Sequence, residues 1–242
     1  MLNTYGKVKF TSGEAIKHVN QARYLGVLLQ HRNKPDVEIS NRLKQTHITW
    51  NKLHKYWKLD KVSKKRRLQV WNAVIKTKLI YGLETLTLTE AQQSKLNTFQ
   101  LKGIRQILKL HTTYLDRENT NKKLYEMANN IAGNATNPKP FRQISSQIKR
   151  NSLKYFGHLV REGYEEPTRK ATFTARMWPN IGTKNRCGRP RHNWILKNMK
   201  KAWKRVKQKL MLDEDEDKHI RFDHRNRKIR SWIEYGAIWR VF

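Results

Sequence analysis

The spacing of apolar residues is the feature that most constrains the fold of this chain. From Asp36 onward, these residues recur at steps of three, four or seven, which is the period of an amphipathic helix. The first such segment is predicted to be one long helix that carries Ile39, Leu43, Trp50, Leu53 and Trp57. The period therefore predicts a mainly α fold.

Capping residues and the same period predict more helices along the chain. Ser63 is an N-cap candidate for a helix that ends near Gly82, and Thr89 with Gln92 forms a capping-box pattern at the start of another. A weaker helix is predicted over about 120–131. Two more are predicted beyond residue 140, one with Phe141, Ile144, Ile148, Phe156, Leu159 and Val160 and one with Trp194, Trp203, Val206 and Leu210.

The first 35 residues have the pattern of strands instead. Val8 and Phe10 alternate with polar residues, and Gly13 lies in a turn-like sequence before Ala15 and Ile16, which predicts a hairpin. The apolar run Tyr24-Leu25-Gly26-Val27-Leu28-Leu29 predicts a further strand. Two or three strands are too few to be stable alone. We therefore expect this small sheet to pack on the following helices or on a domain upstream.

Composition places a boundary between two helical regions. Residues 133–140 combine a glycine with Asn, Thr and two prolines, a composition typical of linkers. We therefore divide the chain into a small β segment at 1–35, a helical domain at 36–132, a linker at 133–140 and a basic C-terminal helical region at 141–242.

The charge of the chain predicts its partner. Lys and Arg number 52 against 19 Asp and Glu, which gives a formal net charge of +33, while eight Trp and nine Tyr favour a folded protein over a disordered basic tail. Such a surface repels itself unless a polyanion neutralises it, and the usual polyanion is RNA or DNA. A solvated basic surface or an anionic lipid face are the alternatives. We expect no membrane partner, because no apolar run approaches the roughly twenty residues of a membrane span.

No metal or cofactor is predicted for this chain. Cys187 is the only cysteine, so an intrachain disulfide and a cysteine-rich zinc site are both excluded. His47 and His54 share a predicted helix face but have no third ligand nearby in sequence. The acidic run at 213–217 lacks the spaced ligands of a calcium loop, and we interpret it as a solvated cluster that offsets neighbouring bases.

Two acid-free intervals are the predicted nucleic-acid contacts. The first lies between Asp60 and Glu84, and its candidate residues are Lys61, Lys64, Lys65, Arg66 and Arg67. They flank the predicted cap Ser63, where the free N–H groups of a helix start favour a phosphate. An ordinary solvated basic face is the alternative.

The second interval, between Glu166 and Asp213, is longer and more basic. Gly188 and Pro190 predict an extended segment at 186–191, whose Arg186, Arg189 and Arg191 are suited to straddling phosphates or entering a minor groove. The following helix adds Lys197, Lys200, Lys201, Lys204 and Arg205. Its Trp194 and Trp203 have helical spacing, which favours a core role over base stacking. We expect this strip to hold most of the affinity, through phosphates rather than bases.

Four short segments resemble the thumb and C-terminal part of LINE-type (non-LTR) retrotransposon reverse transcriptases, in the family's order and at similar spacing. They are Arg23-Tyr24-Leu25-Gly26, similar to KYLG; Leu79-Ile80-Tyr81-Gly82-Leu83-Glu84-Thr85 with Leu86-Thr87-Leu88-Thr89, similar to LLYGSETWTLT; Leu153-Lys154-Tyr155-Phe156-Gly157-His158, similar to LRWFGH; and Gly188-Arg189-Pro190-Arg191-His192-Asn193-Trp194, similar to GRPRKTW. The resemblance covers residues from about 8 to about 200. Leu86 departs from it, because the family has a tryptophan there.

The resemblance implies a nucleic-acid-holding region without its catalytic palm. The family's Tyr-x-Asp-Asp site has no counterpart, the chain contains no Asp-Asp dipeptide, and the palm would lie upstream of residue 1. We therefore expect no polymerase activity from this chain alone, and magnesium only with the palm, since two-metal phosphoryl transfer needs converging carboxylates. The resemblance also implies that Tyr24, Leu25 and Gly26 lie near the primer strand.

Other functions remain open on the sequence. The chain could be a stand-alone structural RNA-binding protein of a ribonucleoprotein, or the remnant of a decayed element. A retroelement protein would be expected in the nucleus, with RNA, DNA and an upstream palm as its partners.

Overall fold

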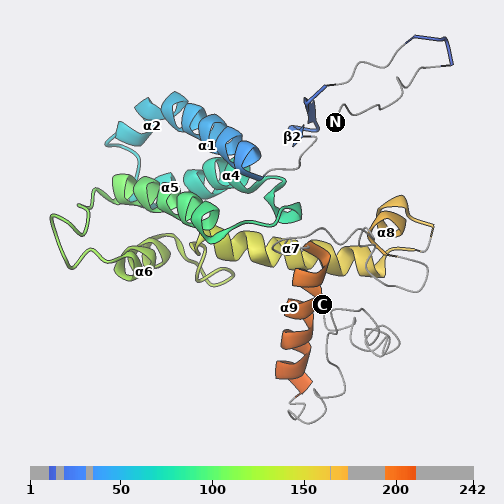
Figure 1. The fold of residues 1–242 in the computed structure, drawn as a ribbon. Coiled ribbons are helices and arrows are strands. Elements are labelled where there is room, and N and C mark those ends of the chain that lie inside the picture. The colour runs from blue at the N-terminus through green and yellow to red at the C-terminus, as the bar shows by residue number, and fades with distance from the viewer. Residues whose placement is uncertain (1–10, 15–18, 31–34, 164, 174–193, 211–242) are drawn as a thin grey trace.

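The computed structural model describes residues 11–14, 19–30, 35–163, 165–173 and 194–210. The fold is mainly α with one small antiparallel sheet, as the sequence predicted. In chain order its elements are β1 (Gln21–Tyr24), β2 (Val27–Gln30), α1 (Pro35–Lys52), α2 (His54–Lys58), α3 (Lys64–Val70), the π-helical segment η1 (Trp71–Lys76), α4 (Thr77–Ile80), the 3-10 turn η2 (Leu83–Thr85), α5 (Glu90–Leu108), α6 (Asn121–Ala132), α7 (Ile144–Arg161), α8 (Pro167–Thr172) and α9 (Trp194–Leu210). Figure 1 shows α1, α4 and α5 lying together, α7 beside them, and α9 crossing α7.

The prediction of a single strand over 24–29 was wrong, because this run folds into a tight hairpin. β1 and β2 pair antiparallel, with Tyr24 opposite Val27. Leu25 and Gly26 form the turn between them, and both have positive φ, at 46° and 79°. Two-residue turns of this kind suit the twist of a hairpin, and they favour glycine. Of the hairpin predicted over 8–16, only the turn at 11–14 lies within the described residues.

The predicted long helix from Asp36 is also interrupted. It ends at Lys52, and α2 begins at His54. The cause is Trp57, whose ring stacks on that of Trp50 with centroids 4.5 Å apart and whose Nε1 donates to the Trp50 carbonyl. Residues seven apart in a straight helix are separated by about 10.5 Å along the axis. The stacked pair therefore requires the chain to bend at Leu53.

The predicted helix starts are confirmed where the signal is local. Ser63 caps α3 by accepting a hydrogen bond from the Arg66 N–H, and Thr89 and Gln92 form the predicted capping box of α5. Thr120 caps α6 in the same way. The helix from Ser63 passes through η1 and ends beside Gly82, which has a φ of +74°. A Cβ there would lie 2.8 Å from Val27, so the approach of the hairpin requires glycine.

The start of α7 is capped by another helix rather than by its own residues. Its N-cap residue makes no side-chain capping bond. Instead, the Ile144 N–H donates to Gln100 Oε1 over 3.1 Å, and the Ser145 N–H donates to Asn97 Oδ1 over 3.0 Å. Both acceptors lie on α5, so two of the free N–H groups of α7 are satisfied by the helix on which it packs.

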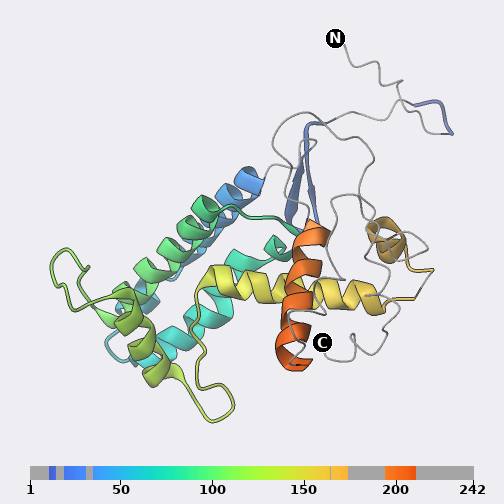
Figure 2. The ribbon, with the colours of Figure 1, turned by 60° about the horizontal axis from the view of Figure 1, so that its bottom comes forward.

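One hydrophobic core spans the predicted linker at 133–140. That segment contains no helix or strand, but Phe141, Ile144 and Ile148 after it belong to the same buried cluster as Trp71 and Ile104 before it. Asn129 fixes the chain after the linker through a pair of hydrogen bonds with the Phe141 main chain. The predicted boundary therefore falls inside a continuous core. Figure 2 shows α6 and α7 on either side of this connection.

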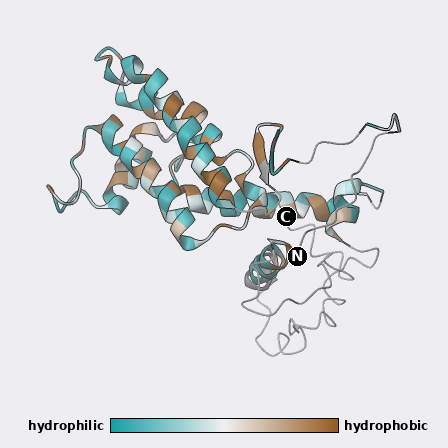
Figure 3. Ribbon diagram, turned by 45° about the horizontal axis from the view of Figure 1, so that its top comes forward, coloured by the Kyte–Doolittle hydropathy of each residue, from teal (hydrophilic) through white to brown (hydrophobic). Residues whose placement is uncertain are grey.

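Apolar and polar residues alternate along the described helices in the way that the helical period predicts (Figure 3). The described part of the chain contains no helix with the length and hydropathy of a membrane span.

Candidate nucleic-acid interface

Helix α9 crosses α7 and is held there by neutral contacts. Trp194 at its start packs on the rings of Tyr155 and Phe156, with centroids 5.9 and 6.1 Å away, and its Nε1 donates to the Glu84 carbonyl over 2.8 Å. One turn later, Asn198 Nδ2 donates to the Ser152 hydroxyl over 3.0 Å in a buried position. Trp194 thus has a packing role at this junction, in line with the preference for a core role.

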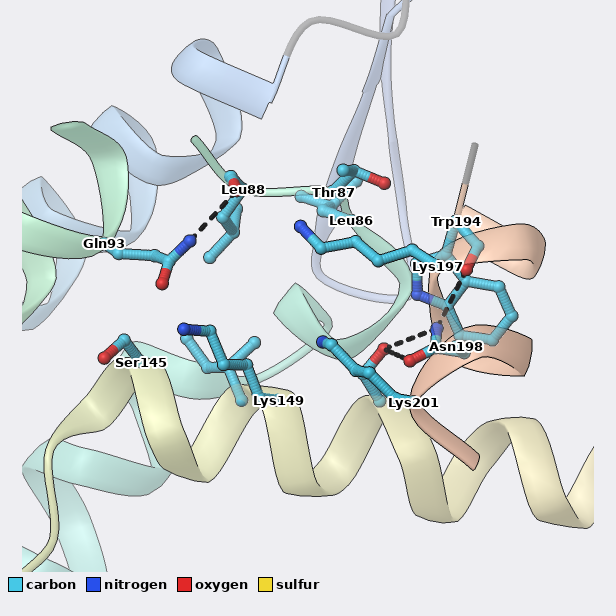
Figure 4. A pocket seen from close by; sticks show the side chains of 12 residues that line it. Leu86, Thr87, Leu88, Gln93, Ser145, Lys149, Trp194, Lys197, Asn198 and Lys201 are labelled. Atoms are coloured by element: carbon cyan, nitrogen blue, oxygen red, sulfur yellow. Dashed lines mark hydrogen bonds between the residues drawn. The ribbon is translucent and has the colours of Figure 1, made fainter. Parts of the chain in front are cut away.

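The crossing creates a groove between α7, α9 and the segment at 86–88. We call it the lysine groove, because Lys149 from α7 and Lys197 and Lys201 from α9 extend into it (Figure 4). The space in it, counted out to the open solvent side, is about 350 Å³. The other lining residues are Leu86, Thr87, Leu88, Gln93, Ser145, Ile148, Ser152, Trp194 and Asn198.

The described lining of the lysine groove carries positive charges only. None of the described residues that line it carries a carboxylate. Burial lowers the pKa of Lys201, and the charges of Lys197, Lys149 and Arg205 lower it further. The apolar floor of leucine, isoleucine and tryptophan side chains reduces the screening by water. The groove therefore brings like charges together, and none of the described residues that line it balances them.

The remaining predicted cations of α9 lie outside the lysine groove. Lys200, Lys204 and Arg205 are exposed, so they extend the positive surface along the helix beyond the groove. The side chain of Trp203 and the predicted extended segment with Arg186, Arg189 and Arg191 lie outside the described residues. The structure therefore brings two of the predicted site residues, Lys197 and Lys201, together with one that the sequence did not single out.

The first predicted strip is divided by the fold. Lys61, Lys64, Lys65 and Arg66 are exposed around the start of α3. Arg67 is a correction, because it is only 4% exposed and its guanidinium donates to the Leu59 carbonyl. Its side chain ties the connection after α2 to α3 and is not available to a phosphate at the surface.

The predicted primer-proximal residues Tyr24, Leu25 and Gly26 form the exposed end of the hairpin, and three side chains hold it. We call Glu38, Arg42 and Tyr81 the turn clamp. Glu38 accepts from the Leu28 N–H over 2.9 Å and from Arg42 Nε over 2.5 Å. Arg42 donates to the Gly26 carbonyl over 2.6 Å and lies over the Tyr81 ring, while the Tyr81 hydroxyl donates to the Leu25 carbonyl over 3.0 Å.

The segments that carry the family resemblance are neighbours in space where the structure describes them. Tyr81 contacts the hairpin turn through the hydrogen bond to Leu25, and Gly82 lies against Val27. Glu84 accepts from Trp194, which in turn packs on Tyr155 and Phe156. Segments from the N-terminal hairpin to α9 thus form one chain of contacts that ends at the lysine groove.

Lys149 is the functional candidate that the sequence did not reveal. It belongs to α7, which carries Lys149, Arg150, Lys154 and Arg161 and no carboxylate, but this acid-free stretch is less basic than the two that the sequence singled out. Its significance depends on the crossing with α9, which no local pattern predicts. Within the described ranges, no three His, Cys, Asp or Glu side chains are grouped so that they could hold a metal ion.

The chain matches no protein-family model, and no curated protein or solved structure matches it. Its function therefore has to be argued from its own residues and their geometry.

Proposed function

We propose that this chain binds nucleic acid through backbone phosphates, as the template- and primer-holding region of a LINE-type reverse transcriptase, whose catalytic palm residues this sequence does not contain. The observation that carries the proposal is the lysine groove, where Lys149, Lys197 and Lys201 meet with no carboxylate among the lining residues that the structure describes. A protein gains no folding stability from grouping like charges, so an anionic ligand is the simplest reason for the arrangement.

The surface around the lysine groove favours a polyanion over a small anion. Lys200, Lys204 and Arg205 continue the positive surface along α9, and the whole chain carries a formal charge of +33. A nucleic acid releases its condensed counterions when Lys and Arg neutralise its phosphates, and this release favours binding at many contacts at once. The exposed residues Lys61, Lys64, Lys65 and Arg66 around α3 are a second, separate contact in this proposal.

The contacts among the segments that resemble LINE-type reverse transcriptases support the same proposal. Tyr81, Glu84, Tyr155 and Trp194 all come from those segments, and they hold the hairpin and α9 in place. The similarity therefore involves residues that position the proposed interface. In this proposal the chain contributes binding, and the chemistry belongs to a palm domain that binds magnesium.

The proposal is tested by the salt dependence of binding to RNA and DNA, in single and double strands. A variant with Lys149→Ala, Lys197→Ala and Lys201→Ala should bind more weakly, and its plot of log K against log salt should lose about two to three units of slope. The matched control changes Lys52, Lys55 and Lys58, which are exposed on α1 and α2, to alanine and removes the same net charge.

Equal slopes for the wild type and the groove variant would contradict the proposal, and so would an equal loss of slope in the control. Template-directed extension of a primer by the chain alone would contradict the assignment of chemistry to an absent palm. Binding without extension also fits a structural RNA-binding protein, and recovery of one stable RNA partner from cells would favour that function instead.

A further inference from the structure

The packing of α9 on α7 combines attraction and repulsion. The attraction comes from the Trp194 hydrogen bond to Glu84, the buried Asn198–Ser152 pair and the buried side chains of Met199 and Ala202. These contacts are neutral. They place Lys197 and Lys201 of α9 in the same groove as Lys149 of α7 (Figure 4).

The repulsion comes from the same crossing. Lys197 and Lys201 approach Lys149 only because α9 lies on α7, so moving α9 away would separate the charges. Burial and neighbouring positive charges both disfavour the charged form of Lys201, and no carboxylate among the described lining residues compensates this charge. An anion in the lysine groove would reverse the sign of this interaction.

We propose that the lysine groove is a binding site for one phosphate group, and that the bound phosphate stabilises the packing of α9 on α7. The inference rests on the proposed function for its natural ligand, a phosphate of a nucleic acid. Lys149, Lys197 and Lys201 supply ammonium donors to this site. The groove is open to solvent on one side, so a phosphate bound to these lysines would keep part of its hydration.

The test is hydrogen exchange of the α9 amides in the full chain, with inorganic phosphate against chloride at equal ionic strength. Ligand binding lowers the population of the open state by a factor of one plus the ratio of ligand concentration to Kd. At ten times Kd, exchange in α9 should therefore slow by about tenfold in the wild type. It should not change in a variant with Lys149→Gln, Lys197→Gln and Lys201→Gln, whereas the matched variant Lys52→Gln, Lys55→Gln and Lys58→Gln should respond like the wild type.

A second variant tests the electrostatic origin of the effect. Lys149→Glu places a carboxylate beside Lys197 and Lys201, so α9 should exchange more slowly without phosphate and lose its response to it. Lys149 is exposed on α7, so this change leaves the core untouched. Faster exchange of α9 in Lys149→Glu, or identical exchange of the wild type in phosphate and chloride, would overturn the proposal.

Short single-stranded oligonucleotides with and without a terminal phosphate distinguish a backbone phosphodiester from a terminal phosphate as the group that binds. Equal protection of α9 by both assigns the site to a backbone phosphodiester, and protection only by the phosphorylated form assigns it to a terminal phosphate. Equal protection by oligoglutamate would overturn the preference for phosphate. If inorganic phosphate protects α9 but no nucleic acid binds, the proposed function fails and the phosphate site remains. If nucleic acid binds without protecting α9, the proposed function stands and the phosphate site in the groove fails.

Discussion

The turn clamp and the lysine groove both hold charged side chains against apolar surface, but only one of them balances its charge. In the turn clamp, Glu38 and Arg42 are 3% and 7% exposed, and they bond to each other and to the main chain of the hairpin. In the lysine groove, Lys149, Lys197 and Lys201 meet with no carboxylate among the described lining residues.

The difference separates two uses of charge in one small protein. A matched and buried pair specifies one geometry, here the position of the hairpin against α1, and removing either member leaves an uncompensated charge. Unmatched cations at the rim of a groove add nothing to that geometry. We infer that the turn clamp serves folding and the lysine groove serves a ligand, and this contrast makes opposite predictions for substitutions.

The largest effect is expected in the turn clamp. Glu38→Ala leaves the Arg42 guanidinium buried without its carboxylate, and it should lower the free energy of unfolding by about 3–5 kcal/mol. Urea unfolding measures the change. The double variant Glu38→Leu with Arg42→Leu should lose less than the single one, because no unpaired charge remains. A loss below about 1 kcal/mol in Glu38→Ala would mean that the pair is solvated in solution.

A smaller loss of unfolding free energy is expected when a buried neutral side chain that makes hydrogen bonds in the core is removed. Gln100 is fully buried, accepts from the Ile144 N–H and the Tyr125 hydroxyl, and donates to the Arg142 carbonyl. Gln100→Ala should cost about 2–3 kcal/mol in urea unfolding, since these partners lose their bonds. Gln147→Ala on α7 is the control and should change stability by less than about 0.5 kcal/mol. Equal effects of the two would contradict the role given to Gln100.

Tyr125 and Lys201 should change the stability of the fold in opposite directions as the pH rises. Burial raises the pKa of Tyr125 to about 12, so the stability that its neutral form contributes is present below pH 10 and is lost as the pH rises toward 12. The pKa of Lys201 is lowered, so its charge opposes folding at neutral pH, and this penalty fades as the pH rises through the lowered pKa toward 10.5.

Thermal unfolding of Lys201→Met checks the second direction. The variant should be slightly more stable than the wild type at pH 7, and the difference should shrink as the pH approaches 10.5. A variant that is less stable than the wild type at pH 7 would show that Lys201 has a partner in solution and would weaken the contrast with the turn clamp.

The parts of the fold that depend on local sequence were predictable. Ser63, Thr89 and Thr120 cap their helices through bonds to residues three positions away, so the short patterns contain the whole signal. The bend at Leu53 was missed because it depends on the stacking of Trp57 on Trp50, which the helical period does not reveal.

The missed parts of the candidate site have the same kind of cause. The turn at Leu25 and Gly26 is held by Arg42 and Tyr81, which lie far away in the sequence. Arg67 was assigned to the surface because a run of bases does not tell which member points inward. Lys149 was missed because its neighbours in the groove come from α9, and a helix crossing has no signature in either helix alone.

The most direct test of the contrast measures stability and binding on one variant, Lys149→Ala with Lys197→Ala and Lys201→Ala. The account predicts a free energy of unfolding equal to or slightly above that of the wild type, within about 0.5 kcal/mol, because no matched interaction is lost. It also predicts a loss of about two to three units in the salt slope of nucleic-acid binding. A destabilised variant with an unchanged slope would contradict it, because the lysines would then be part of the fold and not of the interface.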